Sequence, residues 1–319
     1  MRVLVTGAAG FIGSNLVEEL IRRGDDVVGV DNFITGKPEN IEPFRKAIRF
    51  IEGDLRDPAV CRKCCEGVDY VLHEAALGSV PRSVADPVTS NEHNVTAFLN
   101  LLVAARDAGV KRFVYAASSS AYGDTPTLPK IETMPANPLS PYAVTKFVGE
   151  LYARVFTRVY GLETVGLRYF NVFGPRQDPN GAYAAVIPKF VSALLRGERP
   201  VIHGDGEQTR DFTYVANVVD ANLKAVLAPG HAVGEVLNIG AGGRIALNQL
   251  FGKLCELLDV FPEPIYTETR PGDVRDSQAS IQKAKDLIGY EPSVDVFEGL
   301  ERAIGWYRAT LAPALARTA

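Results

Sequence analysis

Apolar and polar positions change in blocks along the first half of the chain, where short β-branched runs are followed by longer segments of helical periodicity. Glycine or polar residues end each apolar run, as they do at the ends of buried strands. The pattern predicts strands over Val3–Thr6, Asp26–Val30, Ile48–Glu52, Tyr70–His73, Arg112–Ala116 and Thr164–Leu167, and helices over Phe11–Arg23, Asn94–Ala108 and Tyr142–Tyr160. Since strands and helices take turns, we expect an α/β fold with a doubly wound parallel sheet.

The pattern changes after about Asn171, where apolar segments become shorter and glycine, proline and polar residues interrupt them. We therefore expect two regions: a sheet domain over residues 1–171 and a smaller α/β region over 172–319 that supplies most substrate contacts. The chain is expected to cross back to the first domain near 211–228.

Composition narrows the classes of partner. The 319 residues are 46% hydrophobic and 23% charged, with a formal net charge of −4. This charge gives no overall attraction to nucleic acid or to an anionic membrane, so we expect neither as a partner, and any anion site must be local. No apolar run approaches ~18 residues and no secretory segment is visible, so a cytoplasmic location is expected.

The cysteines and histidines do not form a metal-binding pattern. Cys61, Cys64 and Cys65 cluster on a predicted helix, which leaves two interpretations, a metal or redox site and free thiols on a half-buried helix. A structural zinc site usually has four ligands, and no second cysteine or histidine pair accompanies the cluster. We therefore favour free thiols and expect no metal.

A glycine-rich turn follows the first predicted strand and opens the first predicted helix. Gly7, Gly10 and Gly13 form a G-x-x-G-x-x-G pattern, one residue longer at its start than the common dinucleotide fingerprint. Glycines permit a tight turn and let a pyrophosphate approach the backbone amides at the helix N-terminus. The pattern alone is also consistent with a strand–helix turn that binds no ligand.

Two acidic residues at predicted strand ends favour a dinucleotide-binding turn over a turn that binds no ligand. Asp31 lies about 20 residues downstream of the turn, where a carboxylate accepts hydrogen bonds from an adenosine ribose and repels a 2′-phosphate. NAD is therefore expected rather than NADP; the alternative is that Asp31 caps the next turn with Asn32. Asp54 follows the third strand on the expected adenine side, and its alternative role is a helix N-cap.

Tyr142 and Lys146 are four residues apart at the start of a long predicted helix, so they share one face. A neighbouring ammonium and a cationic nicotinamide would favour the phenolate, and we expect the pKa of Tyr142 to lie below its usual ~10. Such a tyrosine is a general base near neutral pH.

The glycine turn, Asp31 and the Tyr142–Lys146 pair together resemble the extended short-chain dehydrogenase/reductase family, and the resemblance extends over essentially the whole chain. It implies a Rossmann-type, NAD-binding domain that also carries the catalytic residues. In that family the tyrosine transfers a proton, the lysine holds the nicotinamide ribose, and a serine at a strand end helps bind the reacting oxygen. The serine position matches Ser118, with Ser119 and Ser120 as helpers; without the resemblance, the three serines are consistent with a simple turn.

Carried over position by position, the resemblance implies two sets of contacts. The implied cofactor contacts are Gly7, Gly10, Phe11, Ile12, Gly13, Asp31, Asn32, Gly36, Asp54, Leu55, Ala75, Ala76, Tyr142, Lys146 and Tyr169. The implied substrate contacts are Ser79, Ser118, Ser119, Ser120, Tyr142, Asn171, Ala185, Val186, Val201, Arg210, Arg270, Asp273 and Ser277. Arg210 and Arg270 match two diphosphate-binding arginines, for which surface salt bridges are the alternative, and Asp273 matches a uridine-ribose contact.

The residues beside the catalytic serine favour one reaction within the family. Related 4,6-dehydratases carry an Asp-Glu pair where this chain has Ser119 and Ser120, and related decarboxylases usually carry a Glu at the position of Ser120. The stretch Leu167–Pro175 resembles the L-R-Y-F-N segment of UDP-galactose 4-epimerases. The resemblance therefore implies 4-epimerisation through a transient 4-keto sugar, with Tyr142 removing the O4 proton and NAD staying bound.

Ser277 bears on the choice of sugar. It lies seven positions after Arg270, where epimerases restricted to non-acetylated sugars carry a bulky tyrosine, and a small residue leaves room for a 2-acetamido group. We favour interconversion of UDP-GlcNAc and UDP-GalNAc, with UDP-Glc and UDP-Gal left open as further substrates; alternatively, Ser277 is only an exposed loop residue. The rival functions are an epimerase or reductase on another nucleotide sugar such as UDP-glucuronate, and a non-catalytic NAD-binding regulatory protein. The resemblance also implies a homodimer.

Overall fold

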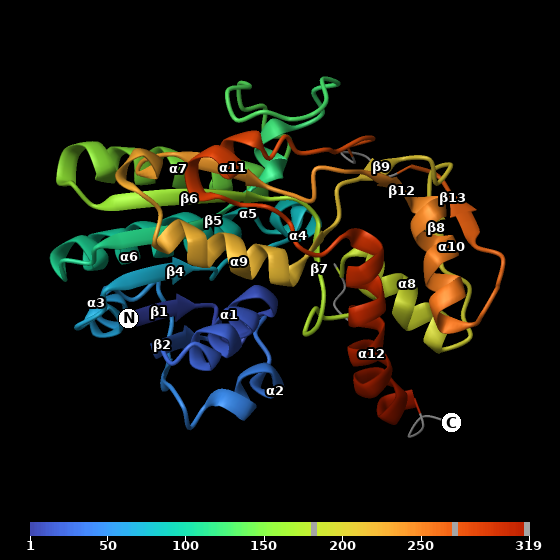
Figure 1. Ribbon diagram of the computed structural model, residues 1–319, viewed down its shortest axis with the longest axis horizontal. Helices are drawn as coiled ribbons and strands as arrows, with labels where there is room; N and C mark the ends of the chain where they lie inside the picture. Colours follow the sequence, from blue (N-terminus) through green and yellow to red (C-terminus); the bar gives the residue numbers. More distant parts are fainter. Residues whose placement is uncertain (180–183, 270–273, 316–319) are drawn as a thin grey trace.

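The computed structural model describes residues 1–179, 184–269 and 274–315, and within them a seven-stranded parallel sheet forms the larger part of the molecule (Figure 1). The strand order is β11-β6-β5-β4-β1-β2-β3. The bounds are β1 (Arg2–Thr6), β2 (Asp26–Asp31), β3 (Arg49–Glu52), β4 (Tyr70–His73), β5 (Arg112–Ser118), β6 (Glu163–Tyr169) and β11 (Val236–Ile239). The predicted doubly wound parallel sheet of the Rossmann type is confirmed.

Helices cover both faces of the sheet because successive residues of its strands point to opposite sides. Val3 and Val5 belong to one hydrophobic cluster, and Leu4 between them belongs to the other. The helices on the first face are α1 (Phe11–Arg22), α9 (Val215–Val226) and α11 (Gln282–Ile288). Those on the second face are α3 (Pro58–Cys65), α6 (Ala97–Asp107) and α7 (Pro141–Tyr160).

The helix predicted over 94–108 differs from the observed one. A π-helical turn over Glu92–Thr96 precedes α6, which begins at Ala97. The side chain of Asn94 accepts a hydrogen bond from the backbone N–H of Leu77 at 2.7 Å and donates to its carbonyl at 3.2 Å. These bonds tie the widened turn to the loop after β4, and short helices α4 (Val80–Ala85) and α5 (Pro87–Asn91) fill the interval.

A smaller region lies beside the carboxyl ends of the strands, on the right in Figure 1, around its own hydrophobic cluster. The helices of this smaller region are α8 (Val186–Leu195), α10 (Leu247–Leu258) and α12 (Val296–Leu315). The remaining short helix, α2 (Pro38–Ile41), belongs to the sheet domain. Its strand pairs are β7 (Val172–Phe173) with β10 (Thr213–Tyr214), β8 (Val201–His203) with β13 (Ile265–Thr267), and β9 (Thr209–Arg210) with β12 (Ile245–Ala246). Between these segments α9 and β11 return to the sheet, and the sequence did not predict β11 as a strand.

The cysteine cluster lies in the hydrophobic core of the sheet domain. Cys61, Cys64 and Cys65 are buried on the inner face of α3 and are free thiols. Burial raises the pKa of Cys61 and of Cys65 to about 12 and that of Cys64 to about 11. Such thiols are poor nucleophiles and poor metal ligands. Across the described residues, no helix combines the length and the apolar character needed to cross a membrane.

Candidate active site

A cavity of about 630 Å³ opens at the carboxyl edge of the sheet, where the sheet domain meets the smaller region. It brings together most of the residues predicted for the cofactor and the substrate. The predicted residues that line it are Gly7, Gly10, Phe11, Ile12, Gly13, Asp31, Asn32, Asp54, Leu55, Ala75, Ala76, Ser118, Ser119, Ser120, Tyr142, Lys146, Tyr169, Asn171, Arg210 and Ser277.

The remaining predicted residues lie elsewhere. Ala185, Val186 and Val201 line a neighbouring cavity of about 250 Å³, which shares Asn171 and Arg210 with the first. Ser79 does not line either cavity, because its hydroxyl caps α4 by accepting a hydrogen bond from the N–H of Arg82 at 3.1 Å. Gly36 lies behind the cavity wall, against Asp31. Arg270 and Asp273 fall outside the described residues.

The glycine turn forms a backbone cradle at the N-terminus of α1. Gly7 has a positive φ of 64°, and its carbonyl accepts the N–H of Gly10 at 2.8 Å. A Cβ at Gly13 would lie 2.1 Å from the carbonyl oxygen of Gly7, so only glycine fits there. No side chain caps the start of α1 at Gly10. The turn therefore fits a pyrophosphate, which would meet uncapped amides and the positive end of the helix dipole.

Asp31 is fixed at the wall of the cavity. Its carboxylate is almost fully buried and accepts hydrogen bonds from the N–H of Ala9 at 2.9 Å and of Phe33 at 2.8 Å. Burial raises its pKa, and these backbone bonds oppose the rise. A Cβ at Gly36 would come within 2.6 Å of the carboxylate, which explains the glycine there. Asp31 thus both caps the turn and lines the cavity where a ribose would lie.

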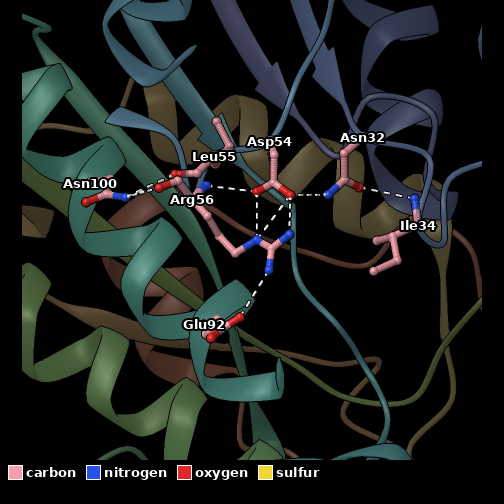
Figure 2. Close-up of polar contacts among 7 residues, drawn as sticks. All are labelled: Asn32, Ile34, Asp54, Leu55, Arg56, Glu92 and Asn100. Carbon is pink, nitrogen blue, oxygen red and sulfur yellow. Dashed lines mark hydrogen bonds and ion pairs between the residues drawn. The ribbon is translucent and has the colours of Figure 1, made fainter. Parts of the chain in front are cut away.

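Figure 2 shows the network of hydrogen bonds and ion pairs around Asp54, a residue that lines the cavity. Arg56 donates to this carboxylate through its backbone N–H at 2.8 Å and through Nη2 at 2.8 Å, and Asn32 donates from Nδ2 at 3.1 Å. Burial raises the pKa of Asp54, but these donors outweigh it and hold the pKa at about 2. The Nη1 atom of Arg56 also reaches Glu92 at 3.0 Å. The N-cap role considered for Asp54 is wrong, because Asp57 caps α3.

Ser118, Tyr142 and Lys146 line the cavity together. Ser118 ends β5, and Ser140 caps the start of α7 by accepting the N–H of Ala143 at 3.2 Å. One helical turn then separates Tyr142 from Lys146. The side chain of Ser118 acts to lower the pKa of Tyr142, and the ammonium of Lys146 donates to the carbonyl of Ala116 at 2.8 Å.

The expected downward shift of the Tyr142 pKa is wrong for the chain by itself. Burial raises this pKa, the hydrogen bond from Ser118 opposes the rise, and the charge of Glu74 adds to it. Lys146 is not among the groups that lower this pKa; burial lowers the pKa of its own ammonium, which donates one hydrogen bond to the carbonyl of Ala116. The chain alone therefore holds Tyr142 as a neutral phenol.

The serine at 120 orients the one at 118. Ser118 Oγ accepts hydrogen bonds from the backbone N–H of Ser120 at 3.2 Å and from its hydroxyl at 2.9 Å. With its lone pairs occupied, the proton of Ser118 is available for Tyr142 or for a substrate oxygen. Neither Ser119 nor Ser120 supplies a carboxylate beside Ser118.

The smaller region supplies the opposite wall through a bridge between two loops. The N–H of Ser277 donates to the carbonyl of Thr209 at 3.1 Å, and Asp276 accepts from the backbone N–H of Thr209 at 3.1 Å and from its hydroxyl at 2.6 Å. Arg210 follows directly and lines both cavities. Asn171, with φ of 25°, marks the point where the chain leaves β6 for β7. This bridge places Ser277 and Arg210 on the same side of the cavity.

Several cavity residues were not predicted from the sequence. Glu74 and Lys130 line the large cavity, and His203 and Gln208 line the small one. Glu74 directly follows β4, and a polar residue at the carboxyl end of a parallel strand is a signal that could have identified it. The other three lie on irregular segments that carry no such signal.

The comparisons with known proteins agree with this geometry. The model of the NAD dependent epimerase/dehydratase family matches residues 3–240. A UDP-glucose 4-epimerase of Mycolicibacterium smegmatis is 38% identical over 312 residues, covering 97% of this chain and 99% of that protein. The crystal structure of a Thermotoga maritima UDP-glucose 4-epimerase with UDP-glucose has a TM-score of 0.93 at 41% identity, covering 98% of this chain and 100% of the other.

A second solved structure carries a different sugar class in its name. It is a UDP-N-acetylglucosamine 4-epimerase from Methanobrevibacter ruminantium, in complex with UDP-N-acetylmuramic acid. Its TM-score is 0.92 at 42% identity, and the alignment covers 97% of this chain and 98% of the other. From the cavity, the catalytic trio and these matches, we conclude that the chain belongs to the NAD-dependent epimerase/dehydratase family of extended short-chain dehydrogenases/reductases.

Proposed function

We propose that the protein is a UDP-sugar 4-epimerase that keeps NAD bound through its catalytic cycle. The observation that carries this proposal is the meeting of Ser118, Tyr142 and Lys146 with the glycine turn in one cavity. The absence of a carboxylate at Ser119 and Ser120 argues against dehydration, because elimination of water needs an acid and a base beside the ketone. A non-catalytic NAD-binding protein would have no use for the assembled trio.

Different residues of the chain would position the sugar O4 and accept its proton. When bound, NAD supplies a hydride acceptor that returns the hydride after the sugar turns over. Ser118 donates a hydrogen bond to O4 and places it against Tyr142, whose oxygen takes the O4 proton. The cationic nicotinamide lowers the pKa of Tyr142, which the chain alone keeps raised. Lys146 and Tyr169 line the same cavity, where Lys146 would hold the nicotinamide ribose and Tyr169 would contribute to the binding of the cofactor.

The nucleotide would occupy the boundary between the two cavities. Arg210 and Asn171 line both, and Arg210 is placed to reach a diphosphate. The small cavity, with Ala185, Val186 and Val201 among its wall residues, then takes the uridine. Arg270 and Asp273 complete the contacts in this proposal through the resemblance only.

Within this activity we favour UDP-GlcNAc and UDP-GalNAc as substrates. Ser277 lines the cavity with a short side chain, and its backbone N–H donates to the carbonyl of Thr209; a side chain of this size leaves space for a 2-acetamido group. UDP-glucuronate is the second candidate, since Lys130 is a cationic residue that lines the cavity. The ammonium of Lys130 already donates to the carbonyl and the hydroxyl of Thr125, so it is less suited to a substrate carboxylate.

Purified protein should be incubated with UDP-GlcNAc, UDP-GalNAc, UDP-Glc, UDP-Gal and UDP-glucuronate in turn, with the products followed by proton NMR. We expect interconversion of the acetylated pair without added NAD. Turnover of UDP-glucuronate alone would favour the second candidate, and no turnover of any of the five would refute the epimerase.

We also propose that the protein acts as a homodimer, with a second copy of the chain covering α7. The outer face of this helix exposes an apolar stripe of Val144, Leu151, Val155 and Val159 at helical spacing. An unbroken apolar stripe on a surface helix is typical of a helix–helix interface.

A further inference from the structure

Glu74 is a carboxylic acid in the cavity that the proposed mechanism does not use. It follows β4 directly and lines the cavity with Lys146 and Tyr142. Its side chain passes β5, the strand between β4 and β6, and reaches Tyr169 at the end of β6. The acid therefore lies on the side of the cavity to which the proposed function assigns the nicotinamide.

A directed chain of hydrogen bonds holds this acid in place. Asn222 on α9 donates from Nδ2 to the carbonyl of Val218 at 2.9 Å, and this bond fixes the orientation of its amide. The second hydrogen of Nδ2 is donated to the hydroxyl of Tyr169 at 2.8 Å. Because that hydroxyl accepts from Asn222, its own proton goes to Oε1 of Glu74, at 2.7 Å. This series of hydrogen bonds, which runs from Asn222 on α9 to Glu74 after β4, therefore gives the carboxyl group of Glu74 one donor, the hydroxyl of Tyr169.

The other oxygen of the same carboxyl group has no partner among the described residues. Oε2 of Glu74 is buried and receives no hydrogen bond. A carboxylate normally accepts several bonds when it is buried, and a buried oxygen without one makes the charged form costly. A group held in place at this cost is a candidate for an electrostatic role.

The charged and titratable groups that face Glu74 come from three elements. Lys146 and Tyr142 on α7 and Tyr169 on β6 surround it, while the adjacent His73 is neutral because burial lowers its pKa to about 3. Burial raises the pKa of Glu74, against the bond from Tyr169 and the charge of Lys146. Burial lowers the pKa of Lys146, against the charge of Glu74. The two groups do not form an ion pair within 4.0 Å, so they act on each other through space.

We propose that Glu74 is a positioning residue that acts through the bound cofactor: its carboxylate, held by Tyr169, favours the oxidised, cationic nicotinamide over the reduced, neutral one. This inference rests on the proposed function, which assigns NAD to this cavity. A fixed negative charge stabilises a nearby cation in a region of low dielectric. An enzyme that must return its hydride in every cycle benefits from a cofactor that does not remain reduced.

The variant that tests this inference is Glu74→Gln, which removes the charge and keeps an oxygen for the proton of Tyr169. Wild-type and variant holoenzymes are titrated anaerobically against a redox dye couple, and the ratio of reduced to oxidised cofactor is read from the reduced-nicotinamide absorbance. At alkaline pH we expect this ratio to be about tenfold higher in the variant at the same dye potential, a shift of about 30 mV for a two-electron couple. Equal potentials in the two proteins would overturn the inference.

The pH dependence separates an electrostatic role from a merely structural one. At acidic pH Glu74 becomes protonated, so the two potentials should converge, whereas a structural effect of the substitution would persist at every pH. Tyr169→Phe is the second variant, because it keeps the acid but removes its single donor and so raises the pKa of Glu74 further. We expect the reduction potential of the cofactor bound to Tyr169→Phe to differ from that in wild type at neutral pH and to approach it at alkaline pH.

If Glu74→Gln fails to bind the cofactor, Tyr169→Phe still tests the inference. A cofactor potential in Tyr169→Phe equal to that of wild type at neutral pH would then overturn it. The dye titration uses no sugar, so its result is separate from the test of the proposed function. A wild-type protein without epimerase activity would defeat the proposed function while leaving the measured shift in potential intact.

Discussion

The backbone N–H of Ser277 donates a hydrogen bond to the carbonyl of Thr209 at 3.1 Å, so a residue from the C-terminal quarter of the chain is held beside Arg210. This bond, with those from Thr209 to Asp276, holds the backbone of Ser277 in the wall of the cavity. The size of the side chain at this position should therefore decide which sugars can turn over.

Ser277→Tyr should selectively remove activity on acetylated sugars. A tyrosine side chain would fill the space that we assign to the 2-acetamido group, and we expect the ratio of kcat/KM for UDP-GlcNAc to that for UDP-Glc to fall by about tenfold or more. Ser277→Ala is the matched control and should leave the ratio near that of wild type. An equal loss on both sugars in the tyrosine variant would contradict the role of Ser277.

Tyr142→Phe should lower kcat by about 10²- to 10⁴-fold, the range expected for loss of a proton-transfer group. The fold and the cofactor content should remain, because the phenyl ring keeps the packing of α7 against the cavity. Bound nucleotide released by acid and separated by chromatography measures the cofactor content. Near-normal turnover by this variant would rule out the phenol as the proton acceptor.

Arg56→Ala should destabilise the protein around Asp54 in a pH-dependent way. The pKa of Asp54 lies below its unfolded value, so the stabilisation that Arg56 provides is present above the unfolded pKa and is lost as the pH falls through about 2. Since this pair is partly exposed, we expect a loss of about 1 kcal/mol in the free energy of unfolding at neutral pH. The measurement is urea denaturation at several pH values.

The same substitution should also increase the fraction of protein that loses its cofactor during gel filtration, since Arg56 joins Asp54 to Glu92 (Figure 2). Arg56→Lys keeps the charge but not the forked contact, and its effect should be intermediate. A stability difference between wild type and the alanine variant that is the same at every pH would show that the ion pair is not its source.

Glu150→Gln should be strongly destabilising. Arg168 contacts Glu150 through Nε at 2.7 Å and Nη2 at 2.6 Å, and the two side chains are 6% and 2% exposed. Removing one charge leaves the guanidinium buried without a counter-ion, and such a change costs about 3–5 kcal/mol. Glu19→Gln, which breaks an exposed pair with Arg22, is the control and should cost less than about 1 kcal/mol. Similar losses in both variants would contradict the difference in burial.

Val155→Glu should convert the proposed homodimer to a monomer. Val155 is 48% exposed at the middle of the α7 stripe, and a charge there would be costly to bury between two copies. Sedimentation velocity gives the mass of the species directly. Phe261→Glu, at a residue that is 73% exposed outside the stripe, is the control and should leave the mass unchanged. A wild-type protein that sediments as a monomer would refute the dimer itself.

The parts of the fold that depend on local pattern were predictable from the sequence. The glycine turn, the strand before it and the helix after it form one continuous segment, so spacing and periodicity were sufficient to locate them. The seventh strand was not predicted, because Val236–Ile239 is short and its only neighbour in the sheet is β6, far away in sequence. The π-helical turn before α6 was missed for a similar reason, since it depends on the bonds between Asn94 and Leu77.

In the site, too, features set by local sequence were predictable and features set by distant contacts were not. Tyr142 and Lys146 share a helix face by spacing alone, and both line the cavity as expected. The direction of the Tyr142 pKa was not predictable, because it depends on how deeply the chain buries the phenol and on the charge of Glu74. The position of Glu74 directly after a strand could have marked it as a cavity residue, but its surroundings come from Tyr169 and Asn222 on distant elements. Residues whose role depends on such non-local contacts cannot be assigned from one sequence.

The position of β11 outside β6 affects how the chain can be divided. A fragment that stopped at residue 171 would contain every strand of the large sheet except β11. The outer edge of β6 would then present unpaired backbone groups from Gly166 to Tyr169, and an uncovered, largely apolar edge of this kind recruits strands from other molecules. Such a truncated product should accumulate in inclusion bodies, so expression trials need the return segment through residue 239.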